Sequence, residues 1–479
     1  MDSTKTITNS GVSVDMFSDA EISASENAYQ VTVETVEKEE NVEITMEQAS
    51  AVEENKKDSS SPISEQNNSA ITENVQKDEV KDAEMDDDVK KDVEMNEESK
   101  EAIVRPVFNF AQTPVQLTGS WNEFKTKDNF FKGCKWAPDG SCILTNNNDG
   151  NLRLWNLPEI FYNTDSEANW SDIKEMSPVL KIREGELIYD YCWYPLMSSL
   201  DSATCCFAST CRNSPVHLLD AYTGELRCSY RPYNNVDEIE AAHSICFSPN
   251  GQKLYCGFNK VIRIFDVNIP GRNFMETKSK IQGQAGIISC IAVNPGMPDT
   301  YAAGSYLKSI ALYSDGCLIC LLQGQRGGVT HIEFSPDGNK LYSGGRMDPE
   351  ILCWDLRNPG TVLYTMERNV TTNQRMYFCS DKSGEYILSG HNNGAISVWD
   401  TNVDNLDDVP LPPKLTFQGH DDCVNGIGLH PTLSLMATTS GQRKFPEPLH
   451  SDDSDSSSDE TFTEKYISFD NSLRLWWVY

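Results

Sequence analysis

Four residues in the last sixty of the chain have types that suit proton transfer or nucleophilic attack. They are His420, Ser440, Asp470 and Trp476. A His, Ser and Asp set resembles the catalytic triad of a hydrolase, in which the serine attacks a carbonyl and the histidine takes its proton. The same side chains equally suit a structural network that ties a loop to two strands. The sequence has no G-x-S-x-G nucleophile elbow, so we favour the structural network and expect no catalytic residues.

A second candidate for chemistry is the C-x-x-C pair Cys317 and Cys320. On a β-strand this spacing sends the two thiols to opposite faces, and zinc would require a second pair. The 15 cysteines are scattered through apolar runs, as expected of buried free thiols. No P-loop, G-x-G-x-x-G or H-E-x-x-H motif occurs. We therefore expect no metal, no cofactor and no enzyme.

The charge of the chain bears on which ligands it can bind. Its 479 residues carry a formal net charge of −32, which argues against a simple nucleic-acid binder because phosphates need a basic surface. The acids are unevenly placed, however: residues 1–104 hold 28 acids against 9 bases, and residues 447–464 hold 7 acids and no base. The rest of the chain carries only −6. The net charge of the whole chain thus reflects two acidic segments rather than the charge of a folded core.

Residues 1–104 have the composition of a disordered tail. They contain no Trp and only two Phe or Tyr residues, too few large apolar groups to offset the entropy of ordering the backbone. The alternative is an acidic amphipathic helix around residues 75–101. The chain also has neither a membrane-spanning apolar run nor an apolar signal core at its start. We expect a soluble intracellular protein with no membrane partner.

Residues 105–479 repeat one unit seven times. Each unit has a short apolar strand, a turn of the Ser-Pro-Asp-Gly type, a second strand ending in small residues, a loop, and a third strand ending in an aromatic. The turns are clearest at 136–140, 247–251, 334–338 and 380–384, and four of six intervals between units lie near 45 residues. Strands of this length and period are typical of WD-repeat blades. We predict an all-β fold, a seven-bladed WD-repeat β-propeller behind a disordered acidic tail.

Closure of the propeller is predicted from the last repeat. That repeat stops at its third strand, Trp476 to Tyr479, and leaves no residues for a fourth. A strand at 107–117, upstream of the first blade, can pair with it and so cover both sheet edges. The predicted domains are a tail at 1–104 and a propeller at 105–479, with a closing strand at 105–118 and an acidic insertion at 447–464.

One face of this propeller is predicted to be basic. The loops before each first strand and between each second and third strand project to the same face, and eleven bases from all seven repeats fall in or near them. Tyr233 and Phe131 lie in the same loops and can stack on unpaired bases. Ordinary solvated loop charges are the alternative, since acids such as Asp149 and Glu184 lie nearby. The residues predicted to bind RNA are Lys132, Arg183, Arg212, Arg231, Tyr233, Lys260, Lys308, Arg326, Arg346, Arg375, Gln442, Arg443 and Lys444.

The insertion at 447–464 follows Gly441-Gln442-Arg443-Lys444. Ser456 and Ser457 each have an acid three residues later, the pattern that acidophilic kinases prefer, so both are candidate phosphorylation sites. We favour a solubilising insertion. The alternative hypothesis is that it competes with nucleic acid for the basic face, more strongly when phosphorylated.

The residues of the repeats resemble one particular WD-repeat family, the telomerase Cajal body proteins. The similarity covers about 105–479 and rests on segments that a generic repeat does not require. These include NFFKGCKWAPDGSCILTN (129–146), YDYCWYPLMSS (189–199), AYTGELRCSYRPYN (221–234), AAHSICFSP (241–249), GQAGIISCIA (283–292), VTTNQRMYF (370–378), SGQRKFPEP (440–448) and SLRLWWV (472–478).

This resemblance implies an RNA-binding scaffold that recognises the Cajal-body box of H/ACA small Cajal-body RNAs and, where present, telomerase RNA. It implies dyskerin-type H/ACA core proteins and telomerase as partners, folding by the cytosolic chaperonin, and a place in nuclear Cajal bodies with some protein in the cytoplasm. Within the basic face we prefer Gln442, Arg443 and Tyr233, because they lie in family-like segments. The alternative function is a protein-interaction platform, such as a ubiquitin-ligase or DNA-repair scaffold, without direct RNA recognition.

Overall fold

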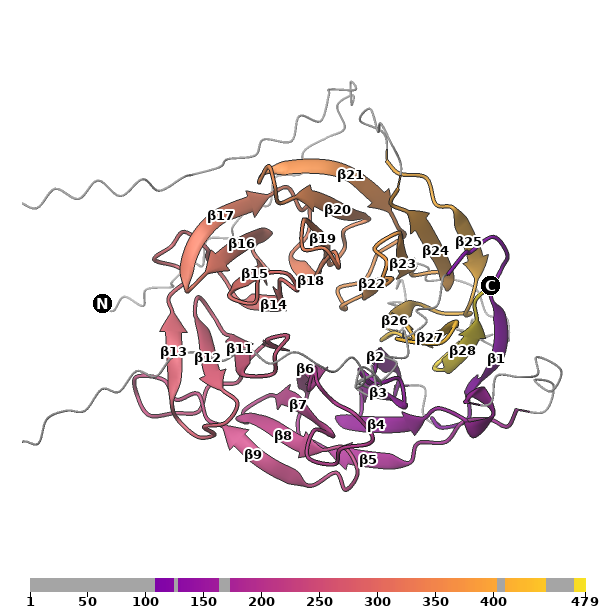
Figure 1. The fold of residues 1–479 in the computed structure, drawn as a ribbon, viewed down its shortest axis with the longest axis horizontal. Coiled ribbons are helices and arrows are strands. Elements are labelled where there is room, and N and C mark those ends of the chain that lie inside the picture. Colours follow the sequence, from indigo (N-terminus) through magenta and orange to yellow (C-terminus); the bar gives the residue numbers. More distant parts are fainter. Residues whose placement is uncertain (1–107, 125–127, 163–172, 403–409, 445–468) are drawn as a thin grey trace, which may run out of the picture. The chain divides into compact units, whose positions relative to one another are not determined.

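The computed structural model describes residues 108–124, 128–162, 173–402, 410–444 and 469–479. In these ranges the chain forms seven four-stranded antiparallel sheets, which follow one another in a ring around a central axis (Figure 1). The predicted seven-bladed propeller is confirmed. The predicted tail, 1–104, lies outside the described residues. No helix in the described part is long and apolar enough to cross a membrane.

The first four blades are continuous in sequence, and in each the first strand lies innermost. Blade one has β2 (Phe131–Trp136), β3 (Cys142–Asn147), β4 (Asn151–Asn156) and β5 (Leu180–Arg183), with the short 3-10 helix η1 (Glu159–Phe161) after β4. Blade two has β6 (Ile188–Trp193), β7 (Cys206–Cys211), β8 (Val216–Asp220) and β9 (Leu226–Tyr230). Blade three has β10 (Ser244–Phe247), β11 (Lys253–Gly257), β12 (Ile262–Asp266) and β13 (Phe274–Thr277). Blade four has β14 (Ile288–Val293), β15 (Thr300–Ser305), β16 (Ser309–Ser314) and β17 (Cys317–Gln323).

Blades five and six repeat this order, and blade seven takes its outer strand from the beginning of the propeller. Blade five has β18 (Val329–Phe334), β19 (Lys340–Gly345), β20 (Glu350–Asp355) and β21 (Thr361–Glu367). Blade six has β22 (Phe378–Ser380), β23 (Tyr386–Gly390), β24 (Ala395–Asp400) and β25 (Leu415–Gln418). Blade seven has β26 (Val424–Leu429), β27 (Leu435–Ser440), β28 (Leu473–Trp477) and β1 (Val115–Ser120).

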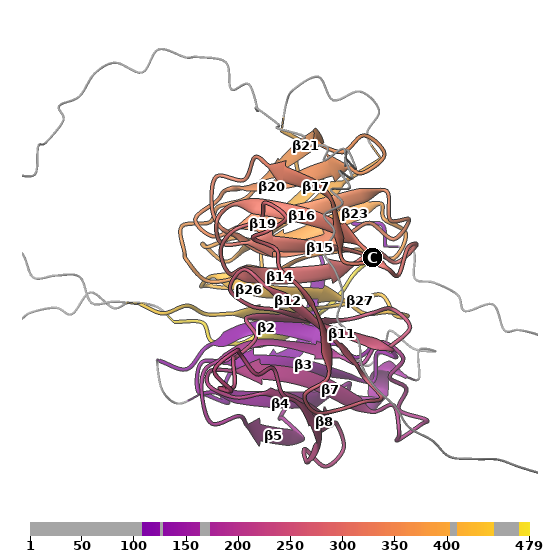
Figure 2. The same cartoon turned by 90° about the vertical axis from the view of Figure 1, so that its left-hand side faces the viewer.

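Strand β1 joins the two ends of the propeller. It pairs antiparallel with β28, from Val115 opposite Trp477 to Ser120 opposite Leu473, with one bulge between Gln116 and Thr118. On the other side of blade seven, β26 and β27 pack against β2 of blade one (Figures 1 and 2). The outer strand of blade seven thus comes from the segment before blade one, and its inner strands pack against blade one. Together these two contacts close the propeller.

In six of the seven blades an aromatic residue near the end of the third strand lies in the core, and in blade two Leu219 takes this place. Trp155, Trp354 and Trp399 are fully buried in β4, β20 and β24, and Phe265 and Tyr313 take the same role in β12 and β16. Large rings at this position fill the space between neighbouring sheets, which is why the repeat keeps an aromatic there. All 15 cysteines are free thiols; on β17 Cys320 is buried and Cys317 is exposed. A bulge between them sets Cys317 opposite Ser314 and Cys320 opposite Leu312, so the simple alternation predicted for this pair is interrupted.

Candidate nucleic-acid interface

The antiparallel order of the blades decides which loops share a face. In each blade the first strand is the innermost one and the following strands run antiparallel to one another. The loop before the first strand and the loop between the second and third strands therefore lie at the same end of the sheet. We call the surface that these loops form the loop face. The other two kinds of turn, including those of the Ser-Pro-Asp-Gly type, lie at the opposite end.

The residues predicted to bind RNA lie in loops of this face or at the strand ends beside them. Seven of them are exposed: Arg183, Arg212, Arg231, Lys260, Lys308, Arg326 and Arg443. Six are partly buried: Lys132, Tyr233, Arg346, Arg375, Gln442 and Lys444. Their surroundings differ, however, and three local groups can be distinguished by contacts.

The first group lies where blades six, seven and one meet. We call it the seam cluster: Lys132, Gln374, Gln442, Arg443 and Lys444. The Gln374 amide donates to the carbonyl of Gly441 at 3.1 Å, and the amide of Asn425 donates to the same carbonyl at 2.7 Å. Three segments distant in sequence are therefore held together at one seam.

Buried Asp422 orders two members of the seam cluster. The Gln442 amide donates to Asp422 Oδ1 at 2.6 Å, and Lys444 Nζ lies 2.9 Å from Asp422 Oδ2. Arg443, between them in sequence, is exposed. Because its two neighbours point at Asp422, the segment is fixed and Arg443 is presented to solvent.

Lys132 is the most electrostatically perturbed lysine of the seam cluster. Its pKa is lowered to about 8, mainly by burial; the carboxylate of Asp149 opposes this shift and the positive charge of Arg443 adds to it. The ammonium of Lys132 and the guanidinium of Arg443 thus repel each other across the junction of blades one and seven. An anion bound between them would relieve this repulsion.

The second group is an ion-pair cluster that joins the innermost strands of several blades. Arg375, in the loop before β22, places Nη1 3.1 Å from Asp190 Oδ1 on β6 and donates from Nη2 to the carbonyl of Ser289 on β14 at 2.7 Å. Lys135 Nζ on β2 lies 3.5 Å from the same Asp190 oxygen. Burial alone would raise the pKa of Asp190, but Lys135 and Arg375 outweigh it and hold that pKa below its usual value. Arg375 therefore holds the loop before β22 against β6 and β14, and its charge is already paired with Asp190.

The third group consists of two arginines stacked on tyrosines. The Arg272 guanidinium lies 3.6 Å from the ring centroid of Tyr233, and that of Arg346 lies 4.5 Å from the ring centroid of Tyr306. Such stacks present a flat cationic surface, the kind of platform on which unpaired bases stack. Arg272 and Tyr306 were missing from the sequence-based set; Tyr306 lies in the turn between β15 and β16 on the loop face, whereas Arg272 lies in the loop between β12 and β13, which the repeat assigns to the opposite end.

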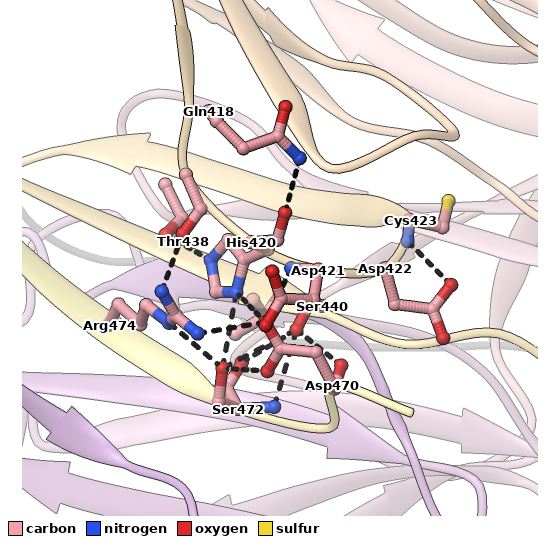
Figure 3. A network of polar contacts seen from close by, with 12 residues as sticks. Gln418, His420, Asp421, Asp422, Cys423, Thr438, Ser440, Asp470, Ser472 and Arg474 are labelled. Carbon is pink, nitrogen blue, oxygen red and sulfur yellow. Dashed lines mark hydrogen bonds and ion pairs between the residues drawn. The ribbon is translucent and has the colours of Figure 1, made fainter. Parts of the chain in front are cut away.

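The structural network predicted for His420, Ser440, Asp470 and Trp476 also includes Thr438 and Ser472 (Figure 3). His420 Nδ1 lies 3.1 Å from both Asp470 Oδ2 and Ser472 Oγ, and its Nε2 lies 2.7 Å from Thr438 Oγ1. Thr438 also accepts the indole N–H of Trp476 at 2.8 Å. Ser440 instead donates to the main-chain carbonyl of Asp470 at 2.5 Å. The hydroxyl that links histidine to tryptophan is thus Thr438, and Thr438 and Ser472 were missed by sequence reasoning.

This network is buried and provides no open nucleophile. Burial lowers the pKa of His420, while hydrogen bonds from His420 and Ser472 outweigh burial at Asp470 and lower the pKa of that carboxyl. The network holds the segment that leads into β28 against β27 and the loop that carries His420. The acidic insertion 447–464, with Ser456 and Ser457, lies outside the described residues. Within the part of the chain that the structure describes, no three His, Cys, Asp or Glu side chains form a metal-binding group.

Comparison with known proteins places this geometry in a family. The model of the WD domain, G-beta repeat, matches residues 122–156, 239–266 and 316–355. Telomerase Cajal body protein 1 of Mus musculus is 54% identical over 72% of this chain and 65% of its own length. The proteins of the same name from Bos taurus and Homo sapiens are 51% and 50% identical over 77% of this chain, and 69% and 68% of their own lengths are covered. The chain thus spans about two thirds of the curated relatives that it matches.

Proposed function

The chain belongs to the telomerase Cajal body protein 1 family, and from that premise we propose that its propeller is a non-catalytic RNA-binding scaffold. It recognises the Cajal-body box in the terminal loop of H/ACA small Cajal-body RNAs, and of telomerase RNA where that RNA carries the box. It directs these ribonucleoproteins to nuclear Cajal bodies together with dyskerin-type core proteins, and supports telomerase. Folding by the cytosolic chaperonin is part of the same proposal.

The seam cluster is the observation that carries the proposal. Three family-like segments, 129–146, 370–378 and 440–448, contribute Lys132, Gln374 and Gln442 to one place on the loop face. Amides beside cations suit the base edges and phosphates of a single-stranded loop.

RNA recovered from cells tests the proposal. The tagged protein is crosslinked to RNA in cells, and the bound RNA is sequenced; enrichment of H/ACA RNAs that carry the box is expected. An Arg443→Ala variant should lose about tenfold or more in affinity for a box-bearing hairpin, because a guanidinium contact to a base or phosphate is removed. Arg357→Ala, an exposed arginine in the turn between β20 and β21 at the opposite end of blade five, is the matched control and should bind normally.

Two outcomes would contradict the proposal. Equal recovery of box-bearing and unrelated RNAs would show that the box is not recognised. Recovery of partner proteins without any RNA would favour the protein-interaction platform instead.

Lys132 gives the RNA complex a distinctive pH dependence. Its pKa in the free fold is about 8, and a bound phosphate should raise that pKa, so that binding takes up a proton at alkaline pH. Affinity should therefore fall between about pH 7.5 and about pH 9.5, where an ordinary lysine of pKa about 10.4 stays charged. Fluorescence anisotropy with a labelled hairpin at constant ionic strength measures this. Lys132→Arg should flatten the profile, whereas an unchanged profile in that variant would contradict a role for Lys132.

A further inference from the structure

The turns between second and third strands differ in the residue at their left-handed position. Blades one and six have glycine there, Gly150 with φ 73° and Gly394 with φ 87°. By the strand pairing on either side, Lys308 occupies the same position in blade four, with φ 67°. Lys260 in the turn of blade three also has φ 67°. A side chain is disfavoured in this region because its Cβ crowds the backbone, so the fold itself would accept glycine more easily than lysine.

These two turns belong to one continuous surface. The backbone N–H of Lys260 donates to the carbonyl of Gly286 at 2.9 Å, and the N–H of Tyr306 donates to the carbonyl of Ile287 at 3.1 Å. The loop 277–287, which holds Lys278 and Lys280, therefore lies between the turns of blades three and four. We call the surface made by these loops and the turn of blade five the lysine arc: Lys260, Lys278, Lys280, Lys308 and Arg346.

Solvent-exposed acids are lacking from the described loops of the lysine arc. Residues 257–261, 277–287, 305–309 and 323–328 contain no Asp or Glu. In the turn of blade five, Asp348 and Glu350 are buried at 0% and 7% exposure. Asp348 accepts the backbone N–H groups of Arg326 and Gly327 at 2.8 and 2.9 Å, and Glu350 lies 2.8 Å from Arg326. Lys278 lies 3.9 Å from the exposed Glu276 of β13, so its charge is partly compensated, whereas the loops that hold Lys260, Lys280 and Lys308 contain no acid.

The loops of blades one and two on the same face are different. They carry Asp149, Glu184 and Glu186 beside the predicted cations Arg183 and Arg212. The loop before β10 of blade three also carries acids, Asp237, Glu238 and Glu240, so the acid-poor part of the loop face runs from the turn of blade three to the turn of blade five. Sequence reasoning placed single bases in every blade and missed Lys278 and Lys280, which lie in a loop longer than the repeat requires.

The arc leads directly toward the seam cluster. The backbone N–H of Met347, in the turn of blade five, donates to the carbonyl of Thr372 at 3.0 Å. Thr372 precedes Gln374 of the seam cluster by two residues. A ligand that follows the arc therefore arrives where the amides of Gln374 and Gln442 lie.

We propose that the lysine arc binds the phosphate backbone of the RNA stem, with Lys308 and Lys260 as its central contacts, while the loop of the RNA lies at the seam cluster; this rests on the proposed function. Lysine is a flexible point charge that holds phosphates without reading sequence. The arc thus supplies affinity and orientation, and the seam cluster supplies specificity.

The left-handed conformation of the two turns allows the charge to be tested separately from the fold. Replacing Lys260 and Lys308 by glycine removes the charge without destabilising the turn. The variant Lys260→Gly with Lys308→Gly should melt at or above the temperature of the unchanged protein, yet bind a box-bearing hairpin at least about tenfold more weakly at low salt. A plot of log affinity against log salt should become shallower by about one per lysine. Asn213→Gly is the matched control: Asn213 has φ 60° in the turn of blade two, so the same strain is relieved without loss of charge.

Each outcome of this comparison has one meaning. Unchanged affinity and salt dependence in the glycine variant, with normal binding by the unchanged protein, would overturn the arc while leaving the proposed function standing. Equal weakening by Asn213→Gly would also overturn it, since backbone flexibility would then be the cause. Failure of the unchanged protein to bind the hairpin would instead defeat the proposed function. Lys260→Asn with Lys308→Asn, which keeps a residue that tolerates left-handed geometry, repeats the test if the glycine variant does not fold.

Discussion

Deletion of residues 105–118 is expected to abolish cooperative folding of the propeller, whereas deletion of residues 1–100 should leave its melting temperature unchanged. The first deletion removes part of β1, the strand paired with β28. It also removes Phe108 and Phe110, which are 5% and 2% exposed in the core of blades six and seven. Truncating one buried Phe costs about 3–5 kcal/mol, and a whole domain is stable by only about 5–15 kcal/mol.

Thermal denaturation followed by circular dichroism measures this difference. The deletion of residues 1–100 leaves every described contact of blade seven in place, since the described residues begin at Phe108. Phe110→Ala is a milder variant: its ring packs against Tyr386 with centroids 5.2 Å apart, so a clear loss of stability with retained folding is expected. Equal melting of the two truncated proteins would contradict the role of β1 in closing the propeller.

Replacement of Asp190 by alanine is expected to cost about 3–5 kcal/mol of unfolding free energy, because it leaves two largely buried cations without their carboxylate. Those cations are Lys135, at 3.5 Å, and Arg375, at 3.1 Å. Asp190 also accepts the backbone N–H of Ile245 at 3.1 Å, which adds to the loss. RNA affinity should fall as well, since Arg375 fixes the loop that carries Gln374.

A double-mutant cycle with Arg375→Met separates the ion pair from general damage. If the pair is the cause, the double variant loses less stability than the sum of the single variants, by about 0.5–3 kcal/mol. Additive losses would contradict the ion-pair explanation. The pKa of Asp190 lies below its unfolded value, so its contribution should be complete at neutral pH and be lost only as the pH falls below about 3.9.

The blade-seven network illustrates how far the sequence could specify the site. Histidine, acid and tryptophan were assigned to a structural network from their order alone. The hydroxyl that bonds both the histidine and the indole could not be identified from the sequence. Residues two apart on a strand point to the same face, and both Thr438 and Ser440 meet that condition. The register of β27 against β28, with Met436 opposite Trp476, decides that Thr438 reaches the indole.

The sequence by itself determined the architecture of this protein: seven β-blades, an all-β class and the face to which each loop projects. These follow from local signals, namely strand alternation, turn residues and an aromatic near the end of most third strands, which repeat often enough to be recognised. The tertiary structure alone decided which charges act together. Arg375 is paired with Asp190 of blade two, and Lys278 and Lys280 join Lys308 in one arc, because residues far apart in sequence become neighbours only when the propeller closes.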